Sequence, residues 1–338
     1  MRKKRSFFEQ IKTQIEQKWN APQYHELKLL LEAFDQQNES AADILYFGDS
    51  VLQRISRDDK DIKTLSEMVA RRLEPVYKTC ILAHSAYTPR IFLALSQVFK
   101  IMRNCPKLVI LPINIRAFSP QWDCRPHWQF EREILALRKF CKSPSHGIPR
   151  FIPSDQLPVS RRKISNFKNQ KVNYYFTKYN QISQFLELIK SKSDDPHEIR
   201  QRWREIFIFH YLYKFGSDHR QIRSLRELLE LLFIMNIFTV VYLTPINYQA
   251  GVRLIGKEFT RIVSENIAVL KQSIVKDHQK QDSKEAIKKP ALMFVDWSMM
   301  LPESLFFHTN DPTEHLNETG RTELANAIVD LIRSSPFI

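Results

Sequence analysis

The residues in this chain best suited to chemistry are a serine near its start and a histidine near its end. Ser50 lies in the tetrad Gly-Asp-Ser-Val at 48–51, directly after the apolar run 44–47. His315 closes the segment Asp-Pro-Thr-Glu-His at 311–315. A serine hydroxyl becomes a nucleophile when an imidazole takes its proton and a third group orients that imidazole. An early serine with a late acid and histidine is therefore one way to supply a nucleophile, a base and an orienting group, provided that the fold brings the two segments together.

Short apolar strands and amphipathic helices alternate along the chain and are expected to position these residues. Continuous apolar runs, typical of strands buried on both faces, lie at 43–49, 76–85, 108–111, 238–243 and 291–295. Helices are expected at 60–74, from the Thr-Pro pair at 88–89 onward, at 250–278 and at 317–334. This alternation indicates an α/β fold with a parallel sheet covered on both faces.

Between the third and fourth strands lies a stretch of roughly 120 residues, far longer than a usual crossover. Helical periodicity within it predicts helices at 128–141, 178–192, 197–214 and 220–236. We therefore divide the chain into a basic amphipathic extension (1–40), an α/β core (41–116 and 238–338) and a helical insertion (117–237). Because the insertion leaves the carboxyl end of the third strand, it can lie over the crevice there as a cap.

Four points far apart in the sequence are expected at one edge of this sheet. Ser50 follows the first strand, Ser85 and Ala86 follow the second, Asn114 follows the third, and His315 comes after the fifth. Loops that leave the carboxyl ends of parallel strands form the crevice in which ligands bind. Any one of these motifs could be explained as a turn between two elements. Their expected convergence at one edge is harder to explain in that way, so it favours an active site.

On these residues the chain resembles the SGNH (GDSL-type) hydrolase family. Gly48-Asp49-Ser50 matches its first block, 85–88 aligns with the second, 112–115 with the third (Gly-x-Asn-Asp), and 311–315 with the last (Asp-x-x-His). The resemblance covers about 43–116 and 238–334 and leaves the insertion unassigned. It implies a flavodoxin-like three-layer α/β/α architecture with a five-stranded parallel sheet, the SGNH hydrolase fold.

The resemblance also implies a mechanism. Ser50 would attack an ester carbonyl, His315 would take its proton, and Asp311 would hold the imidazole tautomer. The backbone N–H groups of Ser50 and Ala86, with the Asn114 side-chain amide, would form the oxyanion hole. Water as acceptor gives an esterase and a sugar hydroxyl gives an O-acyltransferase. The expected substrate is an acyl ester of a carbohydrate, a lipid or a related metabolite.

Two departures from the family pattern bear on this mechanism. Ala86 stands where the family has glycine, and its methyl group narrows close approach. Asp311 and His315 are four residues apart instead of three. Glu314 or a backbone carbonyl could therefore orient His315 in place of Asp311, or a Ser-His dyad could suffice. A catalytically inactive domain of the same fold, binding an anionic ligand or partner, is the alternative function.

The segment 114–128 leaves the third strand beside the expected oxyanion site. Arg116 could clamp a substrate carboxylate or phosphate, and Trp122 could stack on a sugar ring. The other interpretation is a rigid corner in which Arg116 pairs with Asp123 and the tryptophans anchor the insertion. His84, inside the second expected strand, is interpreted as a core histidine with satisfied hydrogen bonds.

Composition narrows the class of protein. The net charge of +14 could favour nucleic acid, an anionic membrane surface or acidic substrates. No finger, RNP or recognition-helix signature is present, so specific nucleic-acid binding is not expected. No glycine-rich phosphate loop is present, and the four cysteines lack metal-site spacing. We therefore expect a cytoplasmic protein with free thiols and without cofactor or metal.

The N-terminal stretch has the pattern of an amphipathic helix. Its apolar face comprises Phe7, Phe8, Ile11, Ile15 and Trp19, and basic residues occupy the rest of the stretch. Such a helix could lie on an anionic membrane as a peripheral contact. It could equally dock on the protein core, and the sequence leaves both open.

Overall fold

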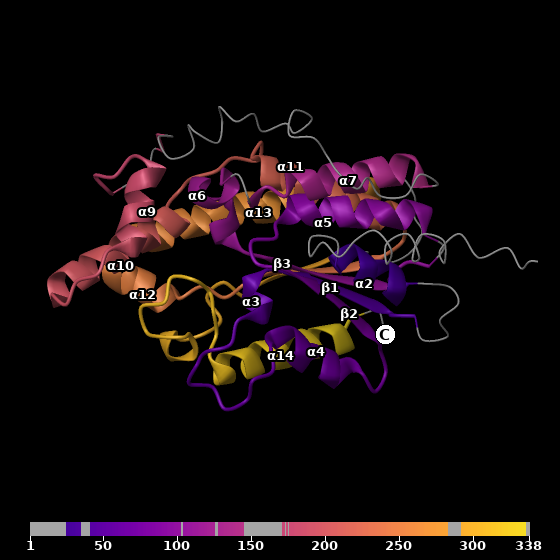
Figure 1. Ribbon diagram of the computed structural model, residues 1–338, viewed down its shortest axis with the longest axis horizontal. Coiled ribbons are helices and arrows are strands. Elements are labelled where there is room, and N and C mark those ends of the chain that lie inside the picture. Colours follow the sequence, from indigo (N-terminus) through magenta and orange to yellow (C-terminus); the bar gives the residue numbers. More distant parts are fainter. Residues whose placement is uncertain are drawn as a thin grey trace, which may run out of the picture.

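The five predicted strands form a single parallel sheet. The computed structural model describes residues 25–34, 41–102, 104–125, 128–144, 171–172, 174, 176–282 and 292–335. The strands are β1 (Ile44–Gly48), β2 (Thr79–Ala83), β3 (Leu108–Ile113), β4 (Phe238–Leu243) and β5 (Leu292–Asp296). Their spatial order, β2-β1-β3-β4-β5, is the flavodoxin-like one (Figure 1). The predicted fold class is confirmed.

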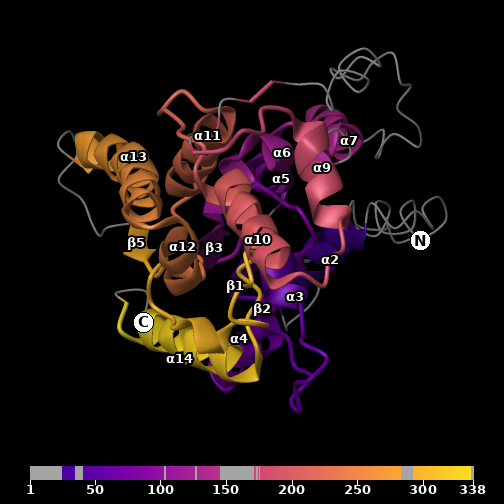
Figure 2. The ribbon, with the colours of Figure 1, turned by 90° about the vertical axis from the view of Figure 1, so that its left-hand side faces the viewer.

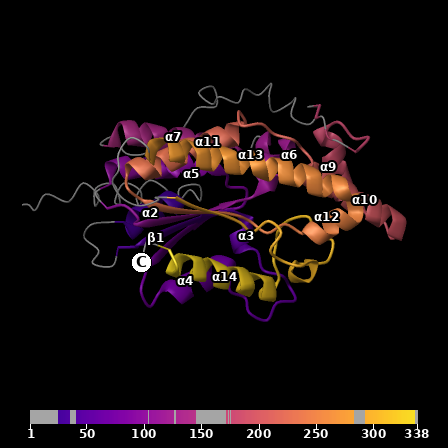
Figure 3. The same cartoon turned by 180° about the vertical axis from the view of Figure 1, so that it is seen from behind.

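Helices cover both faces of the sheet and make it the middle of three layers (Figures 1 and 3). One face carries α4 (Leu65–Leu73) and α14 (Glu318–Arg333), and the other carries α5 (Pro89–Ser96), α11 (Arg220–Ile234) and α13 (Lys257–Asp282). Leu45 and Phe47 pack into one core, whereas Ile44 and Tyr46 pack into the other. Burial on both faces explains why β1 is a continuous apolar run and not an alternating one.

Two helix boundaries differ from the expected ones for local reasons. The helix expected at 60–74 begins at Leu65, because Thr64 and Glu67 form a reciprocal capping box there. Ile62, which precedes the helix, is 75% exposed. The helix expected at 250–278 is two helices, α12 (Tyr248–Ile255) and α13, because Gly256 at φ +89° ends the first.

The insertion contributes to the covering layer and to the end of the sheet. Its described helices are α6 (Pro120–Asp123), α7 (Glu131–Lys142), α9 (Ile182–Lys190), α10 (Pro196–Tyr211) and α11, and they follow the 3-10 helix η3 (Ile115–Phe118). α11 packs along α5 as part of the layer over the sheet. α10 instead lies at the carboxyl ends of the strands, the same end as α3 (Ser50–Gln53), as Figure 2 shows.

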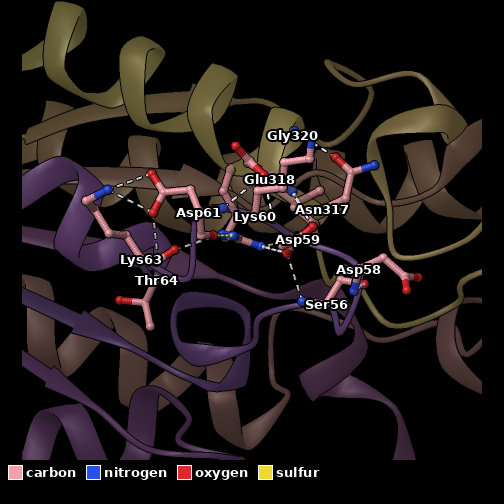
Figure 4. A network of polar contacts seen from close by, with 12 residues as sticks. Ser56, Asp58, Asp59, Lys60, Asp61, Lys63, Thr64, Asn317, Glu318 and Gly320 are labelled. Atoms are coloured by element: carbon pink, nitrogen blue, oxygen red, sulfur yellow. Dashed lines mark hydrogen bonds and ion pairs between the residues drawn. The ribbon is translucent and has the colours of Figure 1, made fainter.

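A buried polar network fixes the start of α14 against the loop that precedes α4 (Figure 4). The side chain of Arg321 is fully buried and pairs with the Asp59 carboxylate, which also accepts from the backbone N–H of Glu318 at 3.0 Å. Glu318 in turn accepts from the backbone N–H groups of Lys60 and Asp61, at 2.9 and 3.1 Å. The network joins the connection after the first strand to the helix that follows His315.

One expectation, the N-terminal amphipathic helix at 7–19, falls on residues that the structure does not describe. Within the ranges that the structure does describe, no helix has both the length and the apolar character needed to cross a bilayer. The four cysteines are free thiols, as predicted. A short helix, α2 (His25–Ala33), lies within the extension 1–40 that the sequence predicts to be helical, and it packs beside β2.

Candidate active site

Ser50 stands at the turn between β1 and α3. Asp49 caps this single-turn helix by accepting a 2.8 Å hydrogen bond from the backbone N–H of Val51. Leu52 folds back over Gly48 so closely that a β-carbon on Gly48 would lie 2.0 Å from the Leu52 Cδ1 atom. The glycine therefore permits the sharp turn that places Ser50, which is 8% exposed, at the carboxyl end of the strand.

The structure brings His315 to Ser50 from the far end of the chain. The His315 Nε2 atom lies 3.2 Å from the Ser50 Oγ atom, although 265 positions separate the two residues. The loop that carries His315 is held by an antiparallel bridge between Phe306 and Leu316 and by a 3.0 Å hydrogen bond from the Phe307 N–H to the His315 carbonyl. The nucleophile and base expected from the sequence are therefore within hydrogen-bond reach.

The surroundings of His315 favour its neutral form. Burial, together with the positive charges of Arg116 and Arg54, lowers the pKa of His315 to about 3. An imidazole with so low a pKa is uncharged at neutral pH. It can therefore offer a nitrogen lone pair to a hydroxyl proton.

Asp311 lies near His315 but reaches it through another residue. No hydrogen bond joins the Asp311 carboxylate to the imidazole in the described part of the chain. Asp311 accepts instead from the Thr313 backbone N–H at 2.7 Å and from the Thr313 hydroxyl. The Thr313 hydroxyl oxygen lies 2.9 Å from the His315 Nδ1 atom. Sequence reasoning missed Thr313, and the four-residue spacing was the available signal.

Glu314, considered as an alternative partner of His315, belongs to a different buried cluster. Its carboxylate lies 2.8 Å from the Arg116 guanidinium and accepts from the Tyr211 hydroxyl at 2.5 Å. Burial raises the pKa of Glu314 to about 7, and the charge of Arg116 opposes this rise. The backbone at Glu314 has φ +54°, in the left-handed region that a residue other than glycine uncommonly adopts.

Asn114 lies between two carboxylates. Its Nδ2 atom is 3.3 Å from Asp49 Oδ2 and 3.3 Å from Glu314 Oε2. Its Oδ1 atom accepts from the Arg116 backbone N–H at 3.0 Å. An amide has two hydrogens to donate, and both are committed to carboxylates in this arrangement. Asn114 could donate to an oxyanion only if it gave up its hydrogen bond to one of these carboxylates.

Ala86 occupies a left-handed backbone conformation, with φ +67°. It lies in a turn closed by a 3.1 Å hydrogen bond from the Tyr87 N–H to the His84 carbonyl. This conformation explains why the family pattern has glycine here, since a β-carbon disfavours positive φ. Among the residues that the structure describes, the backbone N–H groups of Ala86 and Ser50 have no acceptor. Both remain available to a substrate oxygen.

The interpretation of His84 as a core residue is wrong. The residue is exposed at the rim, one position beyond the end of β2, and its Nδ1 atom lies 2.9 Å from the Ser85 carbonyl oxygen. Apolar sequence neighbours suggested burial, but β2 ends at Ala83, and the turn carries His84 out of the sheet.

Arg116 and Trp122 form part of a packed corner. Arg116 is 2% exposed and pairs with Glu314 rather than with Asp123, which pairs with Arg220 at 2.7 Å. The Arg116 guanidinium lies over the Trp122 ring, 4.4 Å from its centre, and the Trp122 and Trp128 rings stack 4.2 Å apart. The corner expected from the sequence is present, with a different ion pair.

The insertion reaches the candidate site through the last turn of α10. The His210 Nδ1–H group donates to the Pro312 carbonyl at 2.8 Å, and the Tyr211 hydroxyl lies 3.0 Å from the same oxygen. Burial lowers the pKa of His210 well below its ordinary value, so this ring is neutral. Two residues of the insertion thus hold the loop between Asp311 and His315, and neither was singled out from the sequence.

No family model matches this chain, and no curated protein matches it in sequence. Similar solved structures include a catalytic mutant of Axe2, an acetylxylan esterase from Geobacillus stearothermophilus, at 12% identity and a TM-score of 0.40 over 88% of this chain and 96% of that chain. Two other Axe2 mutants, described as acetyl-xylooligosaccharide esterases, have identities of 13% and 14% and TM-scores of 0.39. They cover 88% and 87% of this chain and 96% and 95% of their own. Similarity this weak carries no functional argument, so the function has to be argued from the geometry of the candidate site.

Proposed function

We propose that this protein is an SGNH-type serine hydrolase, an esterase or O-acyltransferase that cleaves or transfers an acyl ester. The observation that carries the proposal is the 3.2 Å contact between Ser50 Oγ and a neutral His315 imidazole. Chain segments so far apart have no local reason to meet, and a buried imidazole beside a serine hydroxyl is the arrangement that general-base activation needs.

In the proposed reaction, Ser50 Oγ forms a bond to the ester carbonyl carbon while its proton passes to His315 Nε2. The backbone N–H groups of Ser50 and Ala86 stabilise the oxyanion, and each such donor typically lowers the activation barrier by roughly 3 kcal/mol. The tetrahedral intermediate collapses as His315 returns the proton to the departing alcohol. Water or a sugar hydroxyl then attacks the acyl-enzyme by the same steps, with Asp311 as the nearby negative charge.

The substrate we propose is the acyl ester of a carbohydrate, a lipid or a related metabolite. The buried ion pair with Glu314 favours a structural role for Arg116 over that of an anion clamp. The stack of Trp122 on Trp128 similarly favours a structural role over contact with a sugar. Recognition of the substrate is then the work of other groups at the carboxyl ends of the strands.

A fluorophosphonate probe and a generic acetyl ester test the proposal. The folded wild type should be labelled and should turn over the ester. Ser50→Ala should lose labelling, and His315→Gln should slow it roughly a hundredfold or more. Ser304→Ala, at an exposed serine that is not among the proposed catalytic residues, is the matched control and should label normally. No labelling of folded wild type, or labelling that survives Ser50→Ala, would contradict the proposal.

A non-catalytic domain that binds an anionic ligand is the second candidate. The observation that favours it is the Asn114 amide, whose two hydrogens already serve carboxylates and leave the oxyanion hole with backbone donors alone. In that case calorimetry should detect binding of an anionic carbohydrate or phosphate ester that the protein does not consume, and Ser50→Ala should leave that binding unchanged.

A further inference from the structure

Four polar side chains, from Ser50 to a buried carboxylate, form a chain of hydrogen-bond contacts. Ser50 Oγ lies 3.2 Å from His315 Nε2, and His315 Nδ1 lies 2.9 Å from the Thr313 hydroxyl. The Thr313 hydroxyl in turn donates to Asp311 Oδ1. Asp311 is 3% exposed, so this carboxylate is withdrawn from solvent. We propose that Thr313 is a positioning residue that couples Asp311 to His315 through its hydroxyl, an inference that rests on the proposed function.

The direction of the hydrogen bonds follows from counting donors. The Thr313 backbone N–H donates to Asp311 Oδ1 at 2.7 Å, which makes this oxygen an acceptor. The Thr313 hydroxyl has one hydrogen, and it is spent on the same oxygen. Its lone pair must therefore accept from His315 Nδ1–H. The other nitrogen, Nε2, then carries no hydrogen and faces Ser50 with its lone pair.

This arrangement provides what the attack on an ester requires. As the bond from Ser50 Oγ to the acyl carbon forms, the Ser50 proton moves to His315 Nε2, and the ring becomes positively charged. The Nδ1–H group keeps its proton and its bond to Thr313, so no proton passes to Thr313 or Asp311. The Asp311 charge polarises the hydroxyl between them, and the polarised hydroxyl stabilises the charged ring.

The spacing of the segment explains why a hydroxyl is needed. Asp311 lies four residues before His315, and no direct hydrogen bond joins the two in the described chain. Thr313 lies midway and contacts both. The His210 Nδ1–H group holds the Pro312 carbonyl and the Tyr211 hydroxyl holds the Glu314 carboxylate, so the loop keeps Thr313 in this position. Thr313 thus accounts for the departure from the three-residue spacing.

The experiment compares Thr313→Val, which keeps the shape but removes the hydroxyl, with Thr313→Ser, which keeps the hydroxyl. We expect Val to lower kcat about a hundredfold or more with little change in KM, and Ser to stay within about tenfold of wild type. Thr309→Val, at an exposed threonine of the same loop, is the matched control and should change neither constant. Equal kcat values for Val and wild type would overturn the proposal.

A second readout does not depend on turnover. Nitrogen NMR of the His315 ring in Ser50→Ala should show the proton on Nδ1, and Thr313→Val in the same background should shift it toward Nε2. Asp311→Asn should reproduce this shift, which keeps the proposal falsifiable if Thr313→Val does not fold. A ring with its proton on Nε2 while Thr313 is intact would overturn the coupling even in an active enzyme. Conversely, an inactive wild type with the expected tautomer would refute the proposed function alone.

Discussion

His315 is a buried base that stays uncharged far below the ordinary pKa of histidine. Burial lowers its pKa from 6.5 to about 3. At a pH between these two pKa values, the His315 ring binds a proton in the unfolded chain but not in the folded chain. The unfolded state therefore binds more protons, and the free energy of unfolding falls as the pH falls through this window.

We predict that the free energy of unfolding of wild type falls more steeply with acid than that of His315→Gln. The excess slope should approach about 1.4 kcal/mol per pH unit below pH 6.5, because the buried ring resists the proton that the unfolded ring accepts. Urea titrations at a series of pH values measure both slopes. His210 also has a lowered pKa, but it is present in both proteins and cancels in the comparison. Parallel slopes would contradict the assignment.

Ala86 carries a steric cost that a glycine would relieve. The left-handed region costs a non-glycine residue about 1–2 kcal/mol, while glycine gives up about 0.4–1 kcal/mol through the entropy of the unfolded chain. We therefore expect Ala86→Gly to leave the free energy of unfolding unchanged or raise it by up to about 1 kcal/mol. Ala70→Gly, inside α4, should lower it by about 1 kcal/mol. A loss at Ala86 as large as that at Ala70 would contradict this account.

The residues of the site differ in how far the sequence could predict them. Ser50 and His315 follow from their places after the first and last strands, because a parallel sheet brings strand ends to one edge. The contact of Thr313 with His315 depends on how the loop 311–315 folds, and residue spacing alone does not determine that fold. The same is true of the carboxylates to which the Asn114 amide donates. The partner of Arg116 was predicted wrongly, because Glu314 approaches from a distant segment.

At the scale of elements, the last turn of α10 acts as a clamp on the loop that carries His315. The Tyr211 hydroxyl donates to the buried Glu314 carboxylate at 2.5 Å. A hydrogen bond to a buried charged group contributes about 1.5–3 kcal/mol, more than one between neutral groups. This contact ties the insertion to the core at a point next to the candidate base.

We predict that Tyr211→Phe, measured above the Glu314 pKa of about 7, lowers the free energy of unfolding by about 1.5–3 kcal/mol and lowers kcat more than it raises KM. The matched control is Tyr248→Phe, whose hydroxyl bonds the neutral Thr260 hydroxyl at 2.7 Å and should cost about 1 kcal/mol. Denaturant unfolding and ester kinetics measure the two effects. If both variants lower the free energy of unfolding by the same amount, the hydrogen bond from Tyr211 to Glu314 contributes no more than one between neutral groups, which would contradict the prediction.

Strands and long helices were the elements that the sequence predicted best. All five strands lie where their apolar runs were. In β1 and β3 every residue is buried, which explains why their apolar runs are continuous. The single-turn helices α3 and α6 carried no periodic signal over so few residues. The break at Gly256 was not predicted, because a single glycine inside a run with helical periodicity does not by itself indicate the end of a helix.

At the scale of the whole molecule, Arg321 joins the first and last parts of the core. Its fully buried guanidinium pairs with Asp59 and also donates to the backbone carbonyls of Asp61 and Lys63. The pair holds α14 against the connection that follows Ser50. A buried charge that loses its partner is costly, because neither water nor another cation compensates it.

We predict that Arg321→Met lowers the free energy of unfolding by about 3–5 kcal/mol, because it leaves the Asp59 carboxylate buried without its partner. Ester hydrolysis should decline with the folded fraction. Arg333→Met, at an exposed arginine of the same helix, is the control and should change stability by less than about 0.5 kcal/mol. Thermal and urea unfolding measure both, and a small loss at Arg321 would refute the role given to the network.

The separation of 265 positions between Ser50 and His315 has a consequence for the newly made protein. A ribosome adds about 5–20 residues per second, so the serine emerges on the order of ten seconds to a minute before the histidine. Throughout that interval the nascent chain carries an alcohol with no imidazole to ionise it. The proposed attack on esters therefore cannot begin until the segment that carries His315 has been translated and has packed against Ser50.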